Sequence, residues 1–241
     1  MHSSINIVIP VYNEGENISR TLSEISTKIR TSTQIYAVYD MDEDTTIPAI
    51  KDYLSKNHQV NISLVKNKYG RGALNAIKTG FERVRDGIVL VVMADLSDDL
   101  SNVDEMLNKI NQGYDLVCGS RYMKGGRQIG GPWLKKTLSR IAGVSLYYLA
   151  GLPTHDVTNS FKMYTKQLLN RISIESNGGF ELGMEIVIKA FIRGYKITEV
   201  PCIWSDRSAG KSRFKLWQWL PNYLHWYWLA ITSRYHKRSI A

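Results

Sequence analysis

Acidic side chains follow three apolar, strand-like runs in this sequence. In order they are Glu14, then Asp40, Asp42, Glu43 and Asp44, and finally Asp95, Asp98 and Asp99. Because ligands bind at the carboxyl ends of the strands in an open parallel sheet, we expect the three loops to meet at one edge. Carboxylate oxygens suit a hard divalent cation that bridges the protein to a diphosphate. The pattern therefore predicts a site for a metal-bound nucleotide, although any one of these acids could instead cap a helix.

Alternating strand and helix patterns must position these loops. Apolar, β-branched runs predict strands at residues 5–11, 35–38, 60–65, 87–93, 116–119, 161–164 and 196–203. Apolar residues at helical spacing predict helices at residues 18–29, 46–56, 72–85, 103–112, 133–150 and 181–193. This alternation predicts an α/β fold with a mostly parallel central sheet flanked by helices. We expect one catalytic domain over residues 1–213, followed by an aromatic and basic segment over residues 214–241.

The 241-residue chain carries a formal charge of +9, which indicates an anionic partner. Its 44% apolar and 22% charged composition is typical of a globular protein and excludes a disordered chain. A nucleic-acid-binding module is disfavoured, because no helix-turn-helix, finger or aromatic sheet motif is present. Cys118 and Cys202 lie in apolar runs without metal-ligand spacing, which predicts buried free thiols.

The chain enters its first strand almost at once, without the features of a secretory signal, so we expect a cytoplasmic protein. No uncharged apolar stretch approaches the roughly 20 residues that span a bilayer. The end of the chain nevertheless concentrates aromatic and basic residues, namely Trp217, Trp219, Trp226, Trp228, Arg234, Lys237 and Arg238. An aromatic core helix is one interpretation. The other is a segment that lies at the inner face of a membrane, with its rings at headgroup depth.

Four sequence boxes occur in a characteristic order. They are IVIPVYNEGENI, NKYGRGALNAIKTGF, VVMADLSDD, and GSRYMKGG followed by HDVTNSFKMY. Together, between about Ile5 and Phe214, they resemble the dolichol-phosphate mannose synthase branch of the inverting family 2 glycosyltransferases. The resemblance implies a GT-A-like fold, a nucleotide-sugar donor (GDP-mannose or a UDP-sugar), a polyprenyl or dolichyl phosphate acceptor, and a divalent metal (Mg²⁺ or Mn²⁺).

The resemblance also assigns roles to individual residues on the donor side. It places Pro10, Tyr12, Asn13 and Glu14 at the nucleotide, Asp40 at the base, and Gly70, Gly72 and Asn75 in a loop that approaches the nucleotide. Asp95 corresponds to a metal ligand of the family's aspartate-alanine-aspartate box. The first aspartate of that box is replaced by Met93, which cannot ligate a hard cation. The metal would then rest on Asp95, diphosphate oxygens, water and either Asp98 or Asp99.

On the acceptor side, the resemblance places Arg121 near the donor diphosphate or the acceptor phosphate, with Arg207, Lys211 and Ser212 in a basic loop that closes over it. The planar fork of arginine suits paired phosphate oxygens. Asp156 matches an acidic position of this branch, either as a structural residue or as the base that a hydroxyl acceptor requires. Two alternatives stay open. One is a transferase that extends a glycan with Asp156 as base, and the other is a catalytically silent nucleotide-sugar-binding protein.

Overall fold

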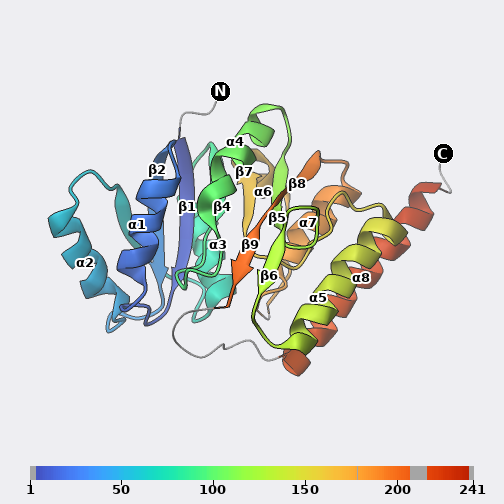
Figure 1. Cartoon of the computed structure of the whole chain (residues 1–241). Helices are drawn as coiled ribbons and strands as arrows, with labels where there is room; N and C mark the ends of the chain where they lie inside the picture. Colours follow the sequence, from blue (N-terminus) through green and yellow to red (C-terminus); the bar gives the residue numbers. More distant parts are fainter. Residues whose placement is uncertain (1–3, 178, 207–215, 239–241) are drawn as a thin grey trace.

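The computed structural model describes residues 4–177, 179–206 and 216–238. A central sheet lies between two layers of helices (Figure 1). The strands are β1 Ser4–Val11, β2 Ser32–Tyr39, β3 Ile62–Lys66, β4 Ile88–Val91, β5 Leu116–Ser120, β6 Arg127–Ile129, β7 Lys162–Thr165, β8 Ile197–Pro201 and β9 Ile203–Ser205. The helices are α1 Ile18–Lys28, α2 Thr46–Lys56, α3 Ala73–Arg83, α4 Val103–Asn111, α5 Trp133–Ala150, α6 Lys166–Arg171, α7 Leu182–Ile192 and α8 Leu216–Arg238, with a 3₁₀ turn at Leu100–Asn102.

The central sheet has the strand order β3-β2-β1-β4-β7-β5-β8. Every strand runs parallel to the others except β7, which is antiparallel to both β4 and β5. A small parallel pair, β6 with β9, lies beside it. The predicted α/β fold with a mostly parallel sheet is therefore confirmed. The strand at residues 161–164 was predicted, but the antiparallel direction of β7 and the small pair were not, because their pairing partners are distant in sequence.

The two faces of the sheet have separate cores because strand side chains alternate. Ile5, Ile7 and Ile9 of β1 pack on one face with residues of α1, α2 and α4. Val8 points to the other face, where α3, α6, α7 and α8 contribute the buried side chains. Both faces are thus covered, as the near-continuous apolar character of the strands requires.

Helix α3 lies unusually close to β1. A Cβ atom added to Gly80 of α3 would come within 2.3 Å of the Val8 Cγ1 atom of β1. Only glycine allows this approach, since any side chain would push the helix off the sheet. This contact fixes α3 against β1, and the helix in turn fixes the end of the loop that precedes it.

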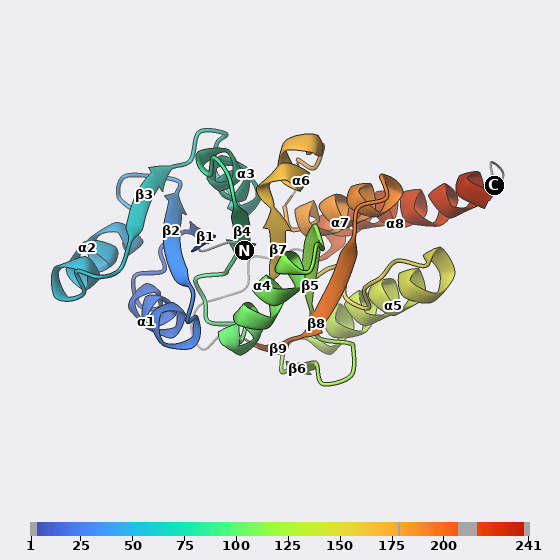
Figure 2. The same ribbon diagram turned by 90° about the horizontal axis from the view of Figure 1, so that it is seen from above.

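Helices α5 and α8 lie side by side beyond the β8 edge of the sheet and project from the body of the molecule (Figure 2). The hydroxyl groups of Ser145 and Tyr227 join them at 3.0 Å, and the Asn222 amide donates to Glu181 at the start of α7 at 3.1 Å. Trp226 is only 4% exposed and packs in the core with Ala230. The expectation that the Trp226 ring lies at headgroup depth is therefore wrong, because the ring packs inside the protein.

Other apolar side chains of these two helices face outward. On α5 they are Trp133, Ile141, Tyr147, Tyr148 and Leu149, and on α8 they are Leu224 and Trp228. Trp133 is 75% exposed and Trp228 is 61% exposed. Within the described residues, no helix combines the length and the apolarity needed to cross a bilayer. The side chain of Trp217 lies outside the described part of the chain, as do those of Arg234, Lys237 and Arg238.

Candidate active site

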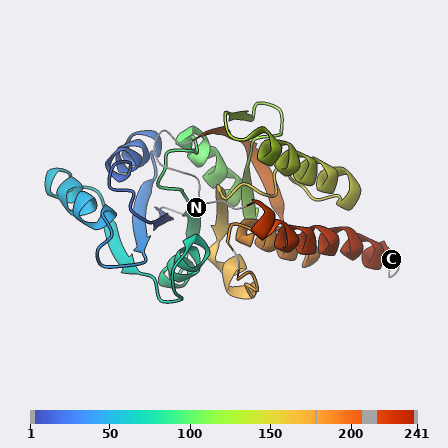
Figure 3. The same ribbon diagram turned by 90° about the horizontal axis from the view of Figure 1, so that it is seen from below.

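The carboxyl ends of β1, β2, β3, β4, β5 and β8 all lie at the same edge of the sheet, because these strands are parallel. Figure 3 views the molecule from the side of this edge. The chain order reverses between β1 and β4, since β2 and β3 lie on one side of β1 and β4 lies on the other. Ligands bind at such switch points in α/β sheets. The prediction that the acidic loops meet at one edge is confirmed by this topology.

The loops after β1 and β2 are joined by hydrogen bonds. Asn13 has a positive φ of 54°, and its amide donates to the buried Asp44 carboxylate at 3.0 Å. The Glu14 amide donates to the Thr46 hydroxyl at 2.9 Å. Pro10 is buried within β1, whereas Asn13 is exposed. The structure therefore presents the predicted nucleotide residues of this loop on a fixed backbone, with Tyr12 and Glu14 half-buried.

Asp40 fixes the glycine-rich loop that follows β3. Its Oδ1 atom accepts from the Asn67 amide at 2.8 Å, and its Oδ2 atom accepts from the Gly72 amide nitrogen at 2.9 Å. Gly70 and Gly72 have φ values of 89° and 120°, a region that glycine adopts without strain. Asn75 holds the same turn by donating to the Tyr69 carbonyl at 2.9 Å. The structure thus brings together Asp40 and the loop residues that the sequence singled out.

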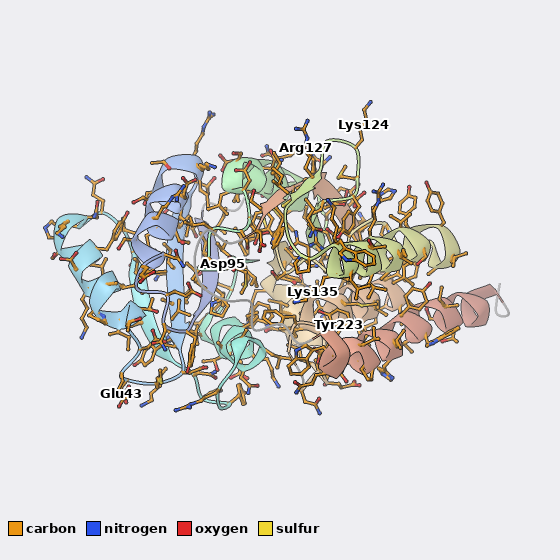
Figure 4. All side chains as sticks on the ribbon, turned by 60° about the horizontal axis from the view of Figure 1, so that its bottom comes forward. Glu43, Asp95, Lys124, Arg127, Lys135 and Tyr223 are labelled. Carbon is orange, nitrogen blue, oxygen red and sulfur yellow. The ribbon has the colours of Figure 1, made fainter. Side chains whose placement is uncertain are left out.

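We call the loops at residues 12–17, 40–46 and 67–72 the N-terminal loops. The hydrogen bonds just described between these loops are single-charge or neutral, whereas Asp42 and Lys68 form solvent-exposed ion pairs with Lys66 and Glu82. Many side chains of the loops stay accessible. Figure 4 shows Glu43 at the outer margin of this region and Asp95 near the centre of the molecule. Glu43 therefore belongs to the outer surface, which is the simpler of the two interpretations of that acid.

Asp95 lies just after β4 and is 6% exposed. Its Oδ1 atom accepts from the Ser97 amide at 3.1 Å, so the carboxylate closes its own turn. Leu96, between the two, has a positive φ of 60°, which is uncommon for a residue with a branched side chain. This turn is held from outside as well, because the Ser205 amide of β9 donates to the Ser97 carbonyl at 2.8 Å.

Asp98 and Asp99 have opposite surroundings. Asp99 accepts from Lys28 at 2.9 Å and from the Ser101 hydroxyl at 2.7 Å, so it caps the turn at Leu100–Asn102. Both carboxylate oxygens of Asp98 are buried, and neither has a hydrogen-bond partner among the described residues. Burial, followed by the nearby charge of Asp95, raises the pKa of Asp98 to about 7. Asp98 is therefore the acid of the VVMADLSDD box whose two oxygens have no hydrogen-bond partner among the described residues and could ligate a cation.

Arg121 and Asp156 form a buried, two-pronged ion pair. The Arg121 Nε atom lies 2.6 Å from Asp156 Oδ2, and the Arg121 Nη2 atom lies 2.9 Å from Asp156 Oδ1. The Arg121 amide also donates to Asp156 at 3.0 Å. The Asp156 side chain is fully buried, and the Arg121 side chain is 10% exposed. The sequence predicted both residues for the site without predicting that they pair.

Further polar groups extend this pair into a network. The Arg121 Nη2 atom also donates to the hydroxyls of Ser139 on α5 and Thr158, each at 3.0 Å, and the Tyr122 hydroxyl donates to Ser139 at 2.8 Å. We call Arg121, Tyr122, Ser139, Asp156 and Thr158 the Arg121 network. Arg121 Nη1 has no hydrogen bond among the described residues. Ser139 was missed by sequence reasoning, because a serine in an amphipathic helix carries no local signal of a distant partner.

The surroundings of Asp156 bear on its use as a base. Burial would raise its pKa, but the charge and hydrogen bonds of Arg121 outweigh burial and hold the pKa of Asp156 below its usual range. Its Oδ1 atom also accepts from Asn159 at 3.2 Å. A carboxylate with a low pKa and occupied oxygens is a poor proton acceptor. This geometry favours the structural interpretation of Asp156 over the catalytic one.

A buried lysine lies beneath the same loop. Lys162 of β7 has no exposed surface, and its ammonium group donates to the carbonyls of Val157 and Asn159. The side-chain amide of Asn159 in turn donates to the Gly119 carbonyl of β5 at 3.0 Å. Sequence reasoning missed this role, although a single lysine inside the strand-like run FKMY was a signal. Lys162 fixes the backbone from which Asp156 reaches Arg121.

The basic loop predicted to carry Arg207, Lys211 and Ser212 lies outside the described residues. The structure does place the chain that leads to it. The Asp99 amide donates to the Ile203 carbonyl of β9 at 3.0 Å, and the Asp206 amide donates to the Ile129 carbonyl of β6 at 3.0 Å. Strand β9 therefore joins the Asp95 turn on one side to β6 on the other.

Comparison with known proteins identifies the family to which the chain belongs. The model of Glycosyl transferase family 2 matches residues 6–173. The chain belongs to this family. The resemblance stated from the four sequence boxes is thereby confirmed, and the chain is a glycosyltransferase.

Two curated members of the family cover most of the chain. Polyprenol monophosphomannose synthase of Mycolicibacterium smegmatis is 30% identical over 214 residues, which are 86% of this chain and 79% of that protein. Dolichol-phosphate mannosyltransferase of Pyrococcus furiosus is 27% identical over 216 residues, which are 88% of this chain. The chain spans 59% of the length of the Pyrococcus protein. Relatives named as mannosyl-transferring enzymes support a hexosyltransferase.

The fold is shared with solved glycosyltransferases of the GT-A type. A structure of glucosyl-3-phosphoglycerate synthase from Mycobacterium tuberculosis, in complex with Mn²⁺, UDP-glucose and phosphoglyceric acid, matches with a TM-score of 0.67. It is 16% identical, and the match covers 96% of this chain and 79% of that chain. At this identity the likeness shows the fold alone, and it confirms the predicted GT-A architecture.

The residues at the Asp95 turn can be compared with the needs of a divalent cation. In the part of the chain that the structure describes, no group of three or more His, Cys, Asp or Glu side chains is placed to hold a metal. Two carboxylates are available, Asp95 and Asp98, and the latter has no other partner in the described residues. Oxygen ligands fit Mg²⁺ or Mn²⁺, and Mg²⁺ commonly uses one or two carboxylates together with substrate phosphates and water. The residues present therefore fit such a cation.

Proposed function

We propose that this glycosyltransferase transfers a hexose from a nucleotide-diphosphate sugar, GDP-mannose or a UDP-sugar, to a polyprenyl or dolichyl phosphate with inversion at the anomeric carbon. The observation that carries the proposal is the buried Arg121 network. It holds a guanidinium group rigidly at the end of β5, on the sheet edge where the N-terminal loops also end. The names of the two curated relatives support the same acceptor class.

A phosphate acceptor agrees with the chemistry of the network. A phosphate monoester has a second pKa of about 6, so its oxygen is already anionic at neutral pH and needs no base. A hydroxyl acceptor would need one, and Asp156 is engaged by Arg121 and by the Asn159 amide. Arg121 would orient the acceptor phosphate for in-line attack, because the cation is already held in place before the acceptor arrives.

The N-terminal loops would bind the nucleotide. Gly70 and Gly72 leave the backbone open to a close approach, and Asp40 holds their loop while retaining partial exposure toward the base. The predicted contacts of Tyr12, Asn13 and Glu14 with the nucleotide belong to the same proposal. A divalent cation held at Asp95 would neutralise charge on the departing nucleoside diphosphate.

The hydrocarbon tail of the proposed acceptor would bring the enzyme to a membrane. We propose that α5 and α8 contact the cytoplasmic face of a bilayer through their exposed rings and apolar side chains. Tyr148 is 69% exposed and Trp228 is 61% exposed, and aromatic rings of this kind favour the headgroup region. The charge of +9 would attract anionic lipids. The Ser139 hydroxyl of the Arg121 network lies on α5 itself, so a lipid phosphate held at the surface would be close to the network.

Transfer is tested with radiolabelled GDP-mannose and UDP-glucose, each incubated with the full chain and either polyprenyl phosphate or the matching unphosphorylated polyprenol. We expect label in the organic extract with the phosphate and none with the alcohol, because only the phosphate is an anionic nucleophile. Equal labelling of both lipids, or labelling of neither with either donor, would overturn the proposal.

Membrane contact is tested by sedimentation with vesicles that contain anionic lipid. The double variant Tyr148→Asp with Trp228→Asp should pellet much less than the natural chain, because it places two charges on the outward faces of α5 and α8. A matched control carries one added charge on the exposed residue after α4, as Gln112→Asp, and should pellet normally. Equal pelleting of the double variant and the natural chain would remove these helices as the membrane contact.

A further inference from the structure

The acidic turn after β4 contains one residue, Asp98, whose buried side chain has no hydrogen bond among the described residues to explain its burial. Both oxygens of Asp98 are buried, and no group among the described residues donates to them. Leaving a carboxylate in this state is costly unless it is protonated or meets a cation. The charged groups close enough to affect it are Asp95, Arg121, Asp156 and Lys162, of which the two cations act through space. Asp98 is thus within electrostatic range of both Asp95 and the Arg121–Asp156 pair.

Other acids nearby lack this property. Asp99 is held by Lys28 and Ser101, and it caps the following turn. Asp44 has one buried oxygen without a partner, but its other oxygen accepts from Asn13 and from Thr46 at 2.8 Å, which fixes the carboxylate in the loops after β1 and β2. Only Asp98, among these three, has two oxygens to offer within the described structure.

The residue at position 93 bears on why both oxygens of Asp98 lack a hydrogen-bond partner among the described residues. Met93 stands where the sequence box would otherwise supply a first carboxylate, and its thioether is a poor ligand for a hard cation. Met93 and Asp98 both line a cavity of about 280 Å³ beside α1 and β9. The two positions therefore lie in the same part of the fold, five residues apart along a turn that Leu96 folds back with its positive φ.

Asp98 is also held firmly in place by its backbone. The Asp99 amide bonds to Ile203, the Ser97 carbonyl accepts from Ser205, and Asp98 itself forms an isolated antiparallel bridge with Trp204. A preorganised ligand loses less entropy when a cation binds. The strand β9 therefore gives Asp98 the rigidity that a metal ligand needs.

We propose that Asp98, together with Asp95, binds the divalent cation that accompanies the donor diphosphate, and that it replaces the carboxylate missing at Met93. This inference rests on the proposed function and names the second protein ligand of that site. It explains why a chain without the first acid of the box retains, three residues after Asp95, a carboxylate whose buried oxygens have no hydrogen-bond partner in the part of the chain that the structure describes.

Mn²⁺ binding measures the inference directly. Free Mn²⁺ gives an electron paramagnetic resonance signal that is lost on binding, so titrations of the full chain with Mn²⁺, in the presence of GDP and separately of UDP, give its affinity without any turnover. Asp98→Asn keeps the size of the side chain and removes its charge. Loss of an outer partner of a metal ligand typically weakens affinity by about 10- to 100-fold, so loss of a direct ligand should weaken it by at least about tenfold.

Asp99→Asn is the matched control, because it removes the same charge from the adjacent residue, which already has Lys28 and Ser101 as partners. It should leave the Mn²⁺ affinity nearly unchanged. Circular dichroism and thermal melting without metal would show that both variants are folded. A further variant, Met93→Asp in the Asp98→Asn chain, should restore most of the lost affinity, because it returns a carboxylate to the first position of the box.

The outcomes separate this inference from the proposed function. Unchanged Mn²⁺ affinity in folded Asp98→Asn, or equal loss in Asp98→Asn and Asp99→Asn, would overturn the role of Asp98 even if sugar transfer to polyprenyl phosphate is observed. Selective loss in Asp98→Asn with rescue by Met93→Asp would establish the ligand, and it would do so even if no label reached the lipid phosphate, in which case the acceptor assignment alone would fail.

Discussion

The N-terminal loops and the Arg121 network lie at the same edge of the sheet but are built differently. In the N-terminal loops, Asp40 accepts bonds from neutral amide groups, and all the other side chains except those of Asp44 and Thr46 are half-buried or exposed. In the Arg121 network, a fully buried carboxylate meets a nearly buried guanidinium group. The N-terminal loops, which we propose to bind the nucleotide, leave most of their polar groups accessible to solvent, whereas the Arg121 guanidinium is oriented by a buried partner. The difference predicts unequal responses to mutation.

The largest effect is expected where the buried pair is broken. Asp156→Ala should lower the free energy of unfolding by about 3–5 kcal/mol, because Arg121 would remain buried without its partner. Urea denaturation followed by circular dichroism measures this change. The control Asp42→Ala breaks a solvent-exposed pair with Lys66 and should change the free energy of unfolding far less, because exposed ion pairs are screened by water. Similar losses in the two variants would contradict the contrast between the regions.

The next largest effect concerns activity alone. Asp95→Ala should abolish sugar transfer while changing the melting temperature less than Asp156→Ala does, because Asp95 would contribute a carboxylate for the cation, and the bond that it accepts from the Ser97 amide is local to its own turn. Donor turnover and thermal melts of the same preparation measure the two quantities. Near-normal turnover in the folded variant would remove Asp95 from the metal site.

A smaller effect is expected at the anchor of the glycine-rich loop. Asp40→Ala removes the bonds to Asn67 and to the Gly72 amide, and losing a hydrogen bond to a charged group typically costs about 1.5–3 kcal/mol. We expect the Kd for the nucleotide to rise by roughly 10- to 150-fold, with stability less affected than in Asp156→Ala. Calorimetric titration with GDP and UDP measures it. If the Kd for both nucleotides were unchanged, Asp40 would have no part in holding the donor.

The smallest effect should come from Gly72→Ala. At a φ of 120° and a ψ of 153°, a Cβ atom strains the backbone by about 1–3 kcal/mol, although no neighbouring atom lies within 4 Å of it. Gly183→Ala in α7, where φ is ordinary and the added Cβ would make normal contacts of 3.4 Å, is the control and should be neutral or stabilising. Melting temperatures of the two variants should therefore move in different directions, and equal shifts would show that φ is not the cause.

The sequence predicted the N-terminal loops far better than it predicted the Arg121 network, and the reason is physical. Strand and helix periodicity is local, so α2 and α5 begin and end where their apolar spacing indicated, and parallel strands bring their following loops to one edge. The pairing of Arg121 with Asp156 spans 35 residues and depends on the antiparallel direction of β7, which the local pattern of that strand does not indicate. Trp226 was misplaced for a similar reason, since burial of an aromatic ring depends on its neighbours in space.

The contact between Gly80 and Val8 limits how α3 and the glycine-rich loop before it can move. Because α3 lies flush against β1, the helix cannot slide or tilt toward the sheet without a collision. At the other end, the glycine-rich loop continues from β3, which is bonded along its length to β2. The glycine-rich loop is thus held at one end by β3 and at the other by α3. Only the residues between β3 and α3 can act as hinges. If the donor binds at this loop as we propose, we expect its entry to rotate the backbone within residues 67–72, with the helix and the sheet as fixed supports.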